Sequence, residues 1–261
     1  MQLPTSRKGT IGVFDSGIGG LTVANAVCGL LPQEALLYVA DNARAPYGPQ
    51  AAEAILDYSR EITTALLAAG AKMIVVACNT ATALAIDALR EEFPEVPFVG
   101  MEPAIKPAAA GSRVGVMATQ ATLNSARYQS LKERFLAGRR VLEDPCRGLV
   151  SLIETDDPRL RGRLEAILRP MLAENIDTLV LGCTHYPLVR AELVEICGPG
   201  ITIIDPAAAA ARQVARLLPY LSPGTRGRAH DFYGTGSTLP LQRVLFTLPE
   251  LNAGRRLVVP L

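Results

Sequence analysis

The sequence has little of the material that nucleic-acid recognition requires. Tryptophan is absent and aromatic residues make up only 5% of the chain, which leaves few side chains to stack against bases. The 26 lysines and arginines are balanced by 25 aspartates and glutamates, so no excess of positive charge attracts phosphates. These shortages argue against a nucleic-acid partner, and we expect a small-molecule substrate instead.

Histidine and cysteine are also scarce. His185 and His230 are the only histidines, which excludes a zinc site with three histidine ligands, and we expect no metal. The five cysteines are an odd number and contain no CxxC pair. We expect reduced thiols, because neither a disulfide framework nor a thioredoxin-like redox motif is indicated.

No apolar run is long enough to cross a bilayer. The segment from Met73 to Ile86 has no charged residue, but it is short and is interrupted by Asn79, Thr80 and Thr82. The first ten residues contain basic side chains and no apolar segment of the kind found in secretory signals. We therefore expect a cytoplasmic protein without a membrane partner.

The 261 residues, 49% of them hydrophobic, are enough for one or two globular domains. Short apolar runs alternate with longer segments of helical period, such as 51–69, where Ile55, Tyr58, Ile62 and Leu66 would share one helix face. This alternation predicts an α/β fold with mainly parallel, doubly wound sheets. The runs read as buried strands are residues 11–14, 36–40, 73–77, 114–118, 178–182 and 201–205.

The chain repeats itself weakly. The segment IGVFDS at Ile11 resembles VGVMAT at Val114, and VVACNT resembles VLGCTH at nearly the same separation. Short similarities between strands also arise by chance, but here a cysteine occupies the same place in both members of the second pair. We predict two similar domains related by a pseudo-dyad, with the active site in the cleft between them. Their predicted extents are 1–100 plus 206–261, and 101–205, and the proline-rich stretch 95–107 is read as the linker.

Polar residues follow the predicted strands of both halves, at the edge where parallel sheets bind ligands. Capping of the next helix explains each of them separately, but it does not explain Cys78 and Cys183 at equivalent positions. We interpret the remaining cysteines, Cys28, Cys146 and Cys197, as small buried hydrophobes. For Cys78 and Cys183 we expect a helix N-terminus to lower the thiol pKa.

Two thiols that face one cleft from opposite sides suit one kind of reaction. One group removes the proton from a carbon stereocentre and the other returns a proton to the opposite face, which inverts the centre. The glycines of residues 15–22 match neither GxGxxG nor the P-loop pattern. We read them as sites of tight turns and close backbone approach, where N–H groups can hold a carboxylate.

Five segments resemble motifs of glutamate racemases, in the aspartate/glutamate racemase superfamily. They are FDSGIGGLTV from Phe14, DNARAPYG from Asp41, ACNTA from Ala77, GMEPAIKPA from Gly100 and GCTHYPL from Gly182. The resemblance implies a cofactor-independent isomerase that interconverts L- and D-glutamate, supplies D-glutamate for peptidoglycan and forms a homodimer. The sequence departs from the family pattern at Ser237 and after Asp205.

The resemblance also implies roles for individual residues. Cys78 and Cys183 would be the catalytic acid and base, assisted by Asp15, His185 and Glu154. The substrate-binding residues that it implies are Asp15, Ser16, Tyr47, Gly48, Asn79, Thr80, Thr119, Thr122, Thr184 and His185. Three other readings stay open: a racemase for aspartate or another amino acid, a non-catalytic protein that binds an acidic metabolite, and a thiol redox protein.

Overall fold

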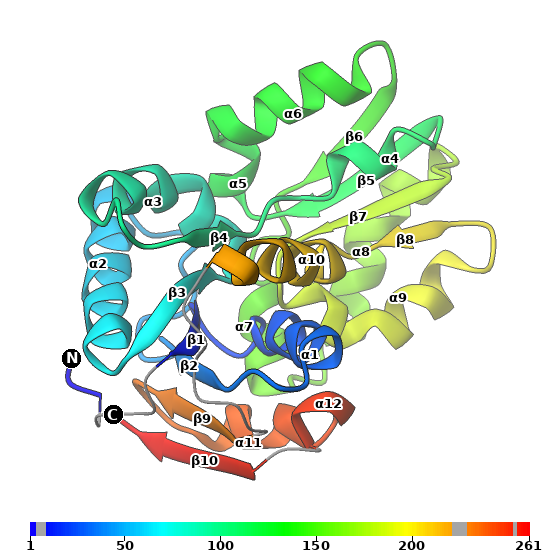
Figure 1. Cartoon of the computed structure of the whole chain (residues 1–261). Helices are drawn as coiled ribbons and strands as arrows, with labels where there is room; N and C mark the ends of the chain where they lie inside the picture. Colours follow the sequence, from blue (N-terminus) through cyan, green and yellow to red (C-terminus); the bar gives the residue numbers. More distant parts are fainter. Residues whose placement is uncertain (4–8, 221–228, 253–254) are drawn as a thin grey trace.

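The chain folds into two parallel β-sheets, each covered by helices on both faces (Figure 1). The computed structural model describes residues 1–3, 9–220, 229–252 and 255–261. The order of the first sheet is β10 (Arg255–Pro260), β9 (Ala229–Gly234), β2 (Leu36–Ala40), β1 (Thr10–Asp15), β3 (Ala71–Val76) and β4 (Phe98–Gly100). The order of the second is β6 (Arg140–Asp144), β5 (Arg113–Ala118), β7 (Thr178–Gly182) and β8 (Thr202–Ile204).

The strand order β2-β1-β3-β4 of the first sheet recurs as β6-β5-β7-β8 in the second. Within these two sets β1 corresponds to β5 and β3 corresponds to β7, and all their pairings are parallel. The predicted fold class, with two mainly parallel α/β units, is confirmed. The predicted domain boundaries stay a prediction, and residues 221–228 of the C-terminal segment lie outside the described residues.

Alternation along the strands of the first sheet separates its two apolar layers. Ile11 and Val13 of β1 face one layer, while Phe14 faces the other. The first layer is covered by α1 (Leu21–Leu30), α10 (Ala207–Leu217), α11 (Leu239–Leu245) and α12 (Pro249–Asn252). The second is covered by α2 (Ala52–Ala68) and α3 (Asn79–Glu92). In α2 the predicted helix face is present, with Ile55, Ile62 and Leu66 buried.

The second sheet is sandwiched in the same way. One face packs against α7 (Leu149–Thr155), α8 (Leu160–Ala173) and α9 (Arg190–Cys197). The other packs against α4 (Ile105–Ala108), α5 (Gln120–Asn124) and α6 (Ala126–Leu136). Two short 3-10 helices, η1 (Tyr186–Val189) and η2 (Leu218–Tyr220), complete the described elements.

All six predicted strands are present, but four other strands were not predicted. The short β4 lies inside the proline-rich stretch, and β6 is a partly exposed edge strand of sequence RVLED. The sequence of β9, AHDFYG, places a histidine and an aspartate in the strand, and β10 begins with two arginines. The segments of β6 and β9 lack the uninterrupted apolar run by which the other strands are found, whereas β4 is a three-residue strand among prolines and the apolar part of β10 follows two arginines.

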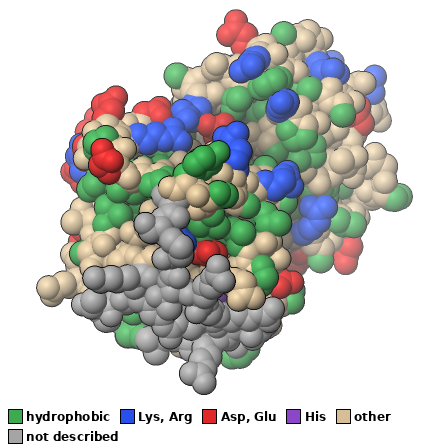
Figure 2. Space-filling view, in the orientation of Figure 1, with side chains coloured by type: hydrophobic (Ala, Val, Ile, Leu, Met, Phe, Trp, Pro, Cys, Tyr) green, Lys and Arg blue, Asp and Glu red, His purple; other side chains and the backbone are tan. Residues whose placement is uncertain are grey.

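The surface in Figure 2 mixes basic, acidic and apolar side chains, and the basic ones lie singly or in small groups. In the described part of the chain no helix has both the length and the apolar character that a membrane crossing requires.

Candidate active site

Cys78 lies at the carboxyl end of β3, directly before α3. The predicted helix N-terminus is present beside it, and its Sγ caps that helix by accepting a hydrogen bond from the backbone N–H of Ala81 at 3.4 Å. It also donates to Ser16 Oγ at 3.8 Å. The expected lowering of the thiol pKa is wrong, however. Burial, and then the negative charge of Asp15, raise the pKa of Cys78, and these effects outweigh the helix N–H group.

Cys183 occupies the equivalent position after β7, but its surroundings differ. The expected α-helix does not begin beside it, because η1 starts at Tyr186 and α9 only at Arg190. Instead, its Sγ lies 3.8 Å from Nδ1 of His185. The helix N-terminus predicted for this thiol is therefore replaced by an imidazole two residues along the chain.

The buried His185 pairs with the partly buried Glu154 next to Cys183. Nε2 of His185 lies 2.7 Å from Oε1 of Glu154, which also accepts the backbone N–H of Ile18 at 2.8 Å. Burial disfavours a charged imidazole, but hydrogen bonds to Cys183 and Glu154 raise the pKa of His185 well above its ordinary value. Burial opposes ionisation of Glu154 as well, yet the hydrogen bond from His185 lowers its pKa overall. The two shifts together favour an ion pair.

This pair gives a pH-dependent stability that can be measured. Because folding raises the pKa of His185, its protonated form stabilises the folded state fully below pH 6.5, and this stabilisation is lost as pH rises through the pKa of the folded state. Because folding lowers the pKa of Glu154, its carboxylate stabilises the folded state fully above pH 4.5, and this stabilisation is lost as pH falls through the pKa of the folded state. We expect Glu154→Gln to lower the free energy of unfolding by about 2 kcal/mol near pH 6 and by less on either side. Urea denaturation from pH 3 to pH 9 tests this, and a constant difference would contradict the ion pair.

Asp15 ends β1 and ties the following glycine-rich turn to the second unit. Its fully buried carboxylate accepts the backbone N–H groups of Gly17 at 3.2 Å and Gly20 at 2.9 Å. The hydroxyl of Thr184, which follows Cys183, donates to the other oxygen at 3.3 Å. Burial raises the pKa of Asp15, although His185 and the backbone donors act in the opposite direction.

The glycine-rich turn after Asp15 approaches the second unit so closely at Gly19 that no larger residue fits there. A Cβ atom at Gly19 would lie 2.7 Å from the backbone nitrogen of His185 and 2.7 Å from Oγ1 of Thr184. The hydroxyl of Thr22 also lies 3.4 Å from the carbonyl oxygen of Thr184. The glycines therefore serve the close approach that was predicted, here between the turn and the GCTHYPL segment.

A chain of hydroxyl groups joins the two units on the other side of the site. Thr80 Oγ1 lies 2.9 Å from Thr119 Oγ1, which in turn lies 3.0 Å from Thr122 Oγ1. Next to Thr80, the amide nitrogen of Asn79 donates to the carbonyl of Met101 at 3.3 Å. No described residue donates to the buried Oδ1 of Asn79, which leaves one acceptor for a ligand.

Tyr47 takes a different place from the one its predicted role suggests. Its hydroxyl donates to Asp41, whose buried carboxylate also accepts from Arg44 Nε at 2.7 Å and from Thr235 Oγ1 at 2.9 Å. The side chain is thus used to anchor the loop, and the neighbouring Gly48 lies against Thr119. Asp41 is a functional candidate that the site prediction missed, although its position at the end of a predicted strand was a signal.

The predicted site residues therefore form one connected group, apart from the side chain of Tyr47, which points to Asp41. Cys28 and Cys197 lie outside this group, whereas Cys146 lines a pocket that also contains Gly48 and Thr119. Cys28 and Cys146 are buried as predicted, whereas Cys197 is only partly buried. Cys28 Sγ lies 3.6 Å from Nε2 of His230.

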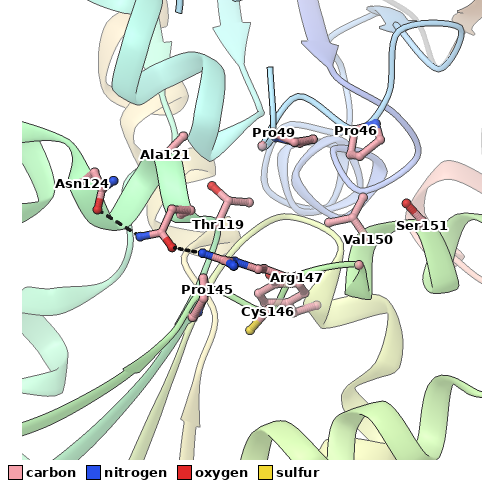
Figure 3. A pocket seen from close by; sticks show the side chains of 14 residues that line it. Pro46, Pro49, Thr119, Ala121, Asn124, Pro145, Cys146, Arg147, Val150 and Ser151 are labelled. Atoms are coloured by element: carbon pink, nitrogen blue, oxygen red, sulfur yellow. Dashed lines mark hydrogen bonds between the residues drawn. The ribbon is translucent and has the colours of Figure 1, made fainter. Parts of the chain in front are cut away.

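A pocket of about 600 Å³ opens beside this group (Figure 3). It shares Gly48 and Thr119 with the predicted substrate-binding residues, and much of its remaining lining is apolar. Among the described residues that line it, Arg147 is the only charged one, and its Nη2 donates to the side-chain oxygen of Gln120 at 3.3 Å. Neither Cys78 nor Cys183 is among the residues that line this pocket.

The fold and the site define a two-unit α/β enzyme with a thiol at matching strand ends. A family model described as Asp/Glu/Hydantoin racemase matches residues 22–214. The chain belongs to this family, and it is an isomerase.

Within the family, glutamate racemases are among its relatives. The enzyme of Pseudomonas aeruginosa is 48% identical over 247 residues, which cover 92% of this chain and 93% of the relative. That of Pseudomonas paraeruginosa is 52% identical over 248 residues, covering 92% and 94%. Among solved structures, Escherichia coli glutamate racemase in complex with L-glutamate and the activator UDP-MurNAc-ala has a TM-score of 0.87 and 34% identity, with coverage of 97% and 98%.

Proposed function

We propose that this chain interconverts L- and D-glutamate without a cofactor, using Cys78 and Cys183 as the two proton-transfer groups. The observation that carries the proposal is the equivalent position of the two thiols. Each follows the corresponding strand, β3 or β7, in two sheets of the same strand order. Glutamate is favoured over aspartate because relatives of 46% identity or more are glutamate racemases.

The reaction needs one thiol and one thiolate at the start. The thiolate removes the Cα proton and becomes a thiol, while the opposite thiol gives its proton to the other face of Cα and becomes a thiolate. The products differ from the reactants only by the exchange of the two protonation states, so the same site runs in both directions. Burial, which raises the pKa of Cys78, makes its thiolate a stronger base once it forms. His185 is placed to stabilise a thiolate at Cys183.

The polar groups around the thiols match the charges of glutamate. The free Oδ1 of Asn79 is an acceptor for the ammonium group. Hydroxyls of Ser16, Thr80, Thr119, Thr122 and Thr184, together with backbone N–H groups near Gly48, are candidates to bind the two carboxylates. Asp15, His185 and Glu154 hold the thiols and the glycine-rich turn in position.

The wider role that we propose is the supply of D-glutamate for peptidoglycan in the cytoplasm, by a homodimer. The support for this role is the similarity to bacterial glutamate racemases. The direct test of the activity is to incubate the protein with a chelator, no added cofactor and either L-glutamate or L-aspartate, and to follow both enantiomers by chiral chromatography. We expect racemisation of glutamate. Racemisation of aspartate alone would favour an aspartate racemase, and glutamate binding without turnover would favour a non-catalytic binding protein.

Arg147 offers a test of how the substrate reaches the site. Its exposed positive charge at the pocket attracts the net negative charge of glutamate through solvent. We expect Arg147→Gln to lower kcat/KM by about threefold at low salt, and Arg147→Glu to lower it further, with both effects shrinking near 0.5 M salt. Arg169→Gln removes the same charge from an exposed position on α8 and serves as the matched control. Equal salt dependence in Arg147→Glu and the unaltered chain would contradict this role.

A further inference from the structure

Arg243 extends from α11, which covers the first sheet, to the last turn of α7 beside the second sheet. Its Nη2 donates to the carbonyl oxygens of Ile153 and Glu154, both at 3.1 Å. Its Nη1 lies 3.8 Å from a carboxylate oxygen of Asp156. The last carbonyls of a helix have no partner within the helix, and the negative end of the helix dipole favours a cation. At this end of α7, Arg243 supplies both a hydrogen-bond donor to the carbonyls and a positive charge.

The turn that Arg243 holds carries Glu154, the carboxylate that pairs with His185. The backbone carbonyl of Glu154 accepts from Arg243, while its side chain accepts from Ile18 and contacts His185. His185 in turn contacts Cys183. A continuous set of contacts therefore leads from the C-terminal helix α11 to one of the two thiols. The positive charge of Arg243 also contributes to the lowered pKa of Glu154.

The other thiol is held by different contacts. Cys78 is fixed by the N-terminus of α3 and by Ser16. The turn that contains Ser16 is anchored by Asp15 through Gly17 and Gly20. Glu154 also holds this turn, at the backbone N–H of Ile18, so the contacts that lead from Arg243 to Cys78 pass through the turn and Ser16, whereas those to Cys183 pass through His185 alone. A change at Arg243 should therefore disturb the two thiols unequally.

We propose that Arg243 is a positioning residue for proton transfer at Cys183, acting through Glu154 and His185. The inference rests on the proposed two-thiol function. It makes α11, which is far from α7 in the sequence, a part of the catalytic apparatus on one side of the substrate only. The Arg243 guanidinium itself contacts neither thiol.

The test measures each thiol separately. In Cys78→Ala only Cys183 remains, and in Cys183→Ala only Cys78 remains, so each variant reports one proton transfer as exchange of the Cα proton in deuterated water. Adding Arg243→Gln should slow exchange about tenfold in the Cys78→Ala chain and less than twofold in the Cys183→Ala chain. Arg243→Lys, which keeps the charge and one donor, should restore part of the rate. Arg212→Gln on α10 removes the same charge from an exposed position and should change neither rate.

Two results would overturn the inference. Equal slowing in both backgrounds would show a general effect on the fold, and no slowing in the Cys78→Ala chain would show that Arg243 does not act on Cys183. Absence of exchange in both parent variants and of racemisation in the native chain would instead remove the proposed function.

A second measurement uses the otherwise native chain: Arg243→Gln should move the acid limb of the kcat/KM profile to higher pH, since Glu154 loses a nearby cation. An unmoved limb would contradict the inference.

Discussion

Cys78→Ala and Cys183→Ala are each expected to lower the rate of glutamate racemisation by about 10³-fold or more, because each removes one of the two proton-transfer groups. Both thiols are buried, at 5% and 6% exposure, so water cannot readily replace them. Loss of one sulfur atom leaves only a small cavity, and we expect both variants to remain folded. Chiral chromatography of L- and D-glutamate after incubation measures the loss.

The two variants should differ in the enantiomer from which they still remove the Cα proton. Enantiomers have equal free energies, so kcat/KM is the same in both directions for any variant, and the difference must be sought in isotope exchange. Each single-thiol variant should exchange the Cα proton of one enantiomer, and the two variants should select opposite enantiomers. Cys28→Ala, which removes a buried thiol outside the site, is the control and should racemise normally. Native activity in either active-site variant would remove the mechanism.

Gly19→Ala is expected to lower kcat/KM by about 100-fold with little loss of global stability. The added Cβ would lie 2.7 Å from the backbone nitrogen of His185 and 2.7 Å from Oγ1 of Thr184, so the turn must move away from the second unit. That movement separates Asp15 from Thr184 and displaces His185 from Cys183. The assay combines racemisation kinetics with thermal unfolding.

Gly162→Ala provides the matched control. Gly162 lies within α8, where an added Cβ meets no atom within 4 Å. Alanine is the better helix former by up to about 1 kcal/mol, so this variant should be slightly more stable and fully active. If Gly19→Ala keeps native kinetics, the close approach of the turn has no catalytic importance.

The sequence predicts the central strands because their apolar runs are buried on both faces. It does not predict β9 and β10: β9 pairs with β2, which joins segments almost 200 residues apart, and β10 pairs with β9. Such pairing depends on tertiary contacts, and a strand with the sequence AHDFYG has no local pattern that reveals it. The weak internal repeat indicates two similar units, but the strand order β2-β1-β3-β4 that they share becomes visible only in the folded chain.

The site shows the same division. Cys78, Cys183 and Asp15 can be located from motifs, since their neighbours along the chain carry the family pattern, and Glu154 is named by the family resemblance. Asp41 begins one of these motifs, but its contact with Thr235 from a distant segment cannot be read from the sequence, and neither can the contact of Arg243 with the carbonyls of α7. The direction of the pKa shift at Cys78 was also wrong in the prediction. A helix N-terminus can be inferred from sequence, but the burial that outweighs it requires the packed structure.

The most direct test of the two-thiol mechanism is the isotope content of each enantiomer during the first few per cent of conversion. L-glutamate is incubated with the native chain in deuterated water, and both enantiomers are separated and analysed by mass spectrometry. If one thiol removes the proton and the other supplies a solvent-derived deuteron, the D-glutamate formed carries deuterium at Cα while the remaining L-glutamate keeps its proton. D-glutamate that retains the original proton would show that a single group carries it from one face to the other, and would contradict the mechanism.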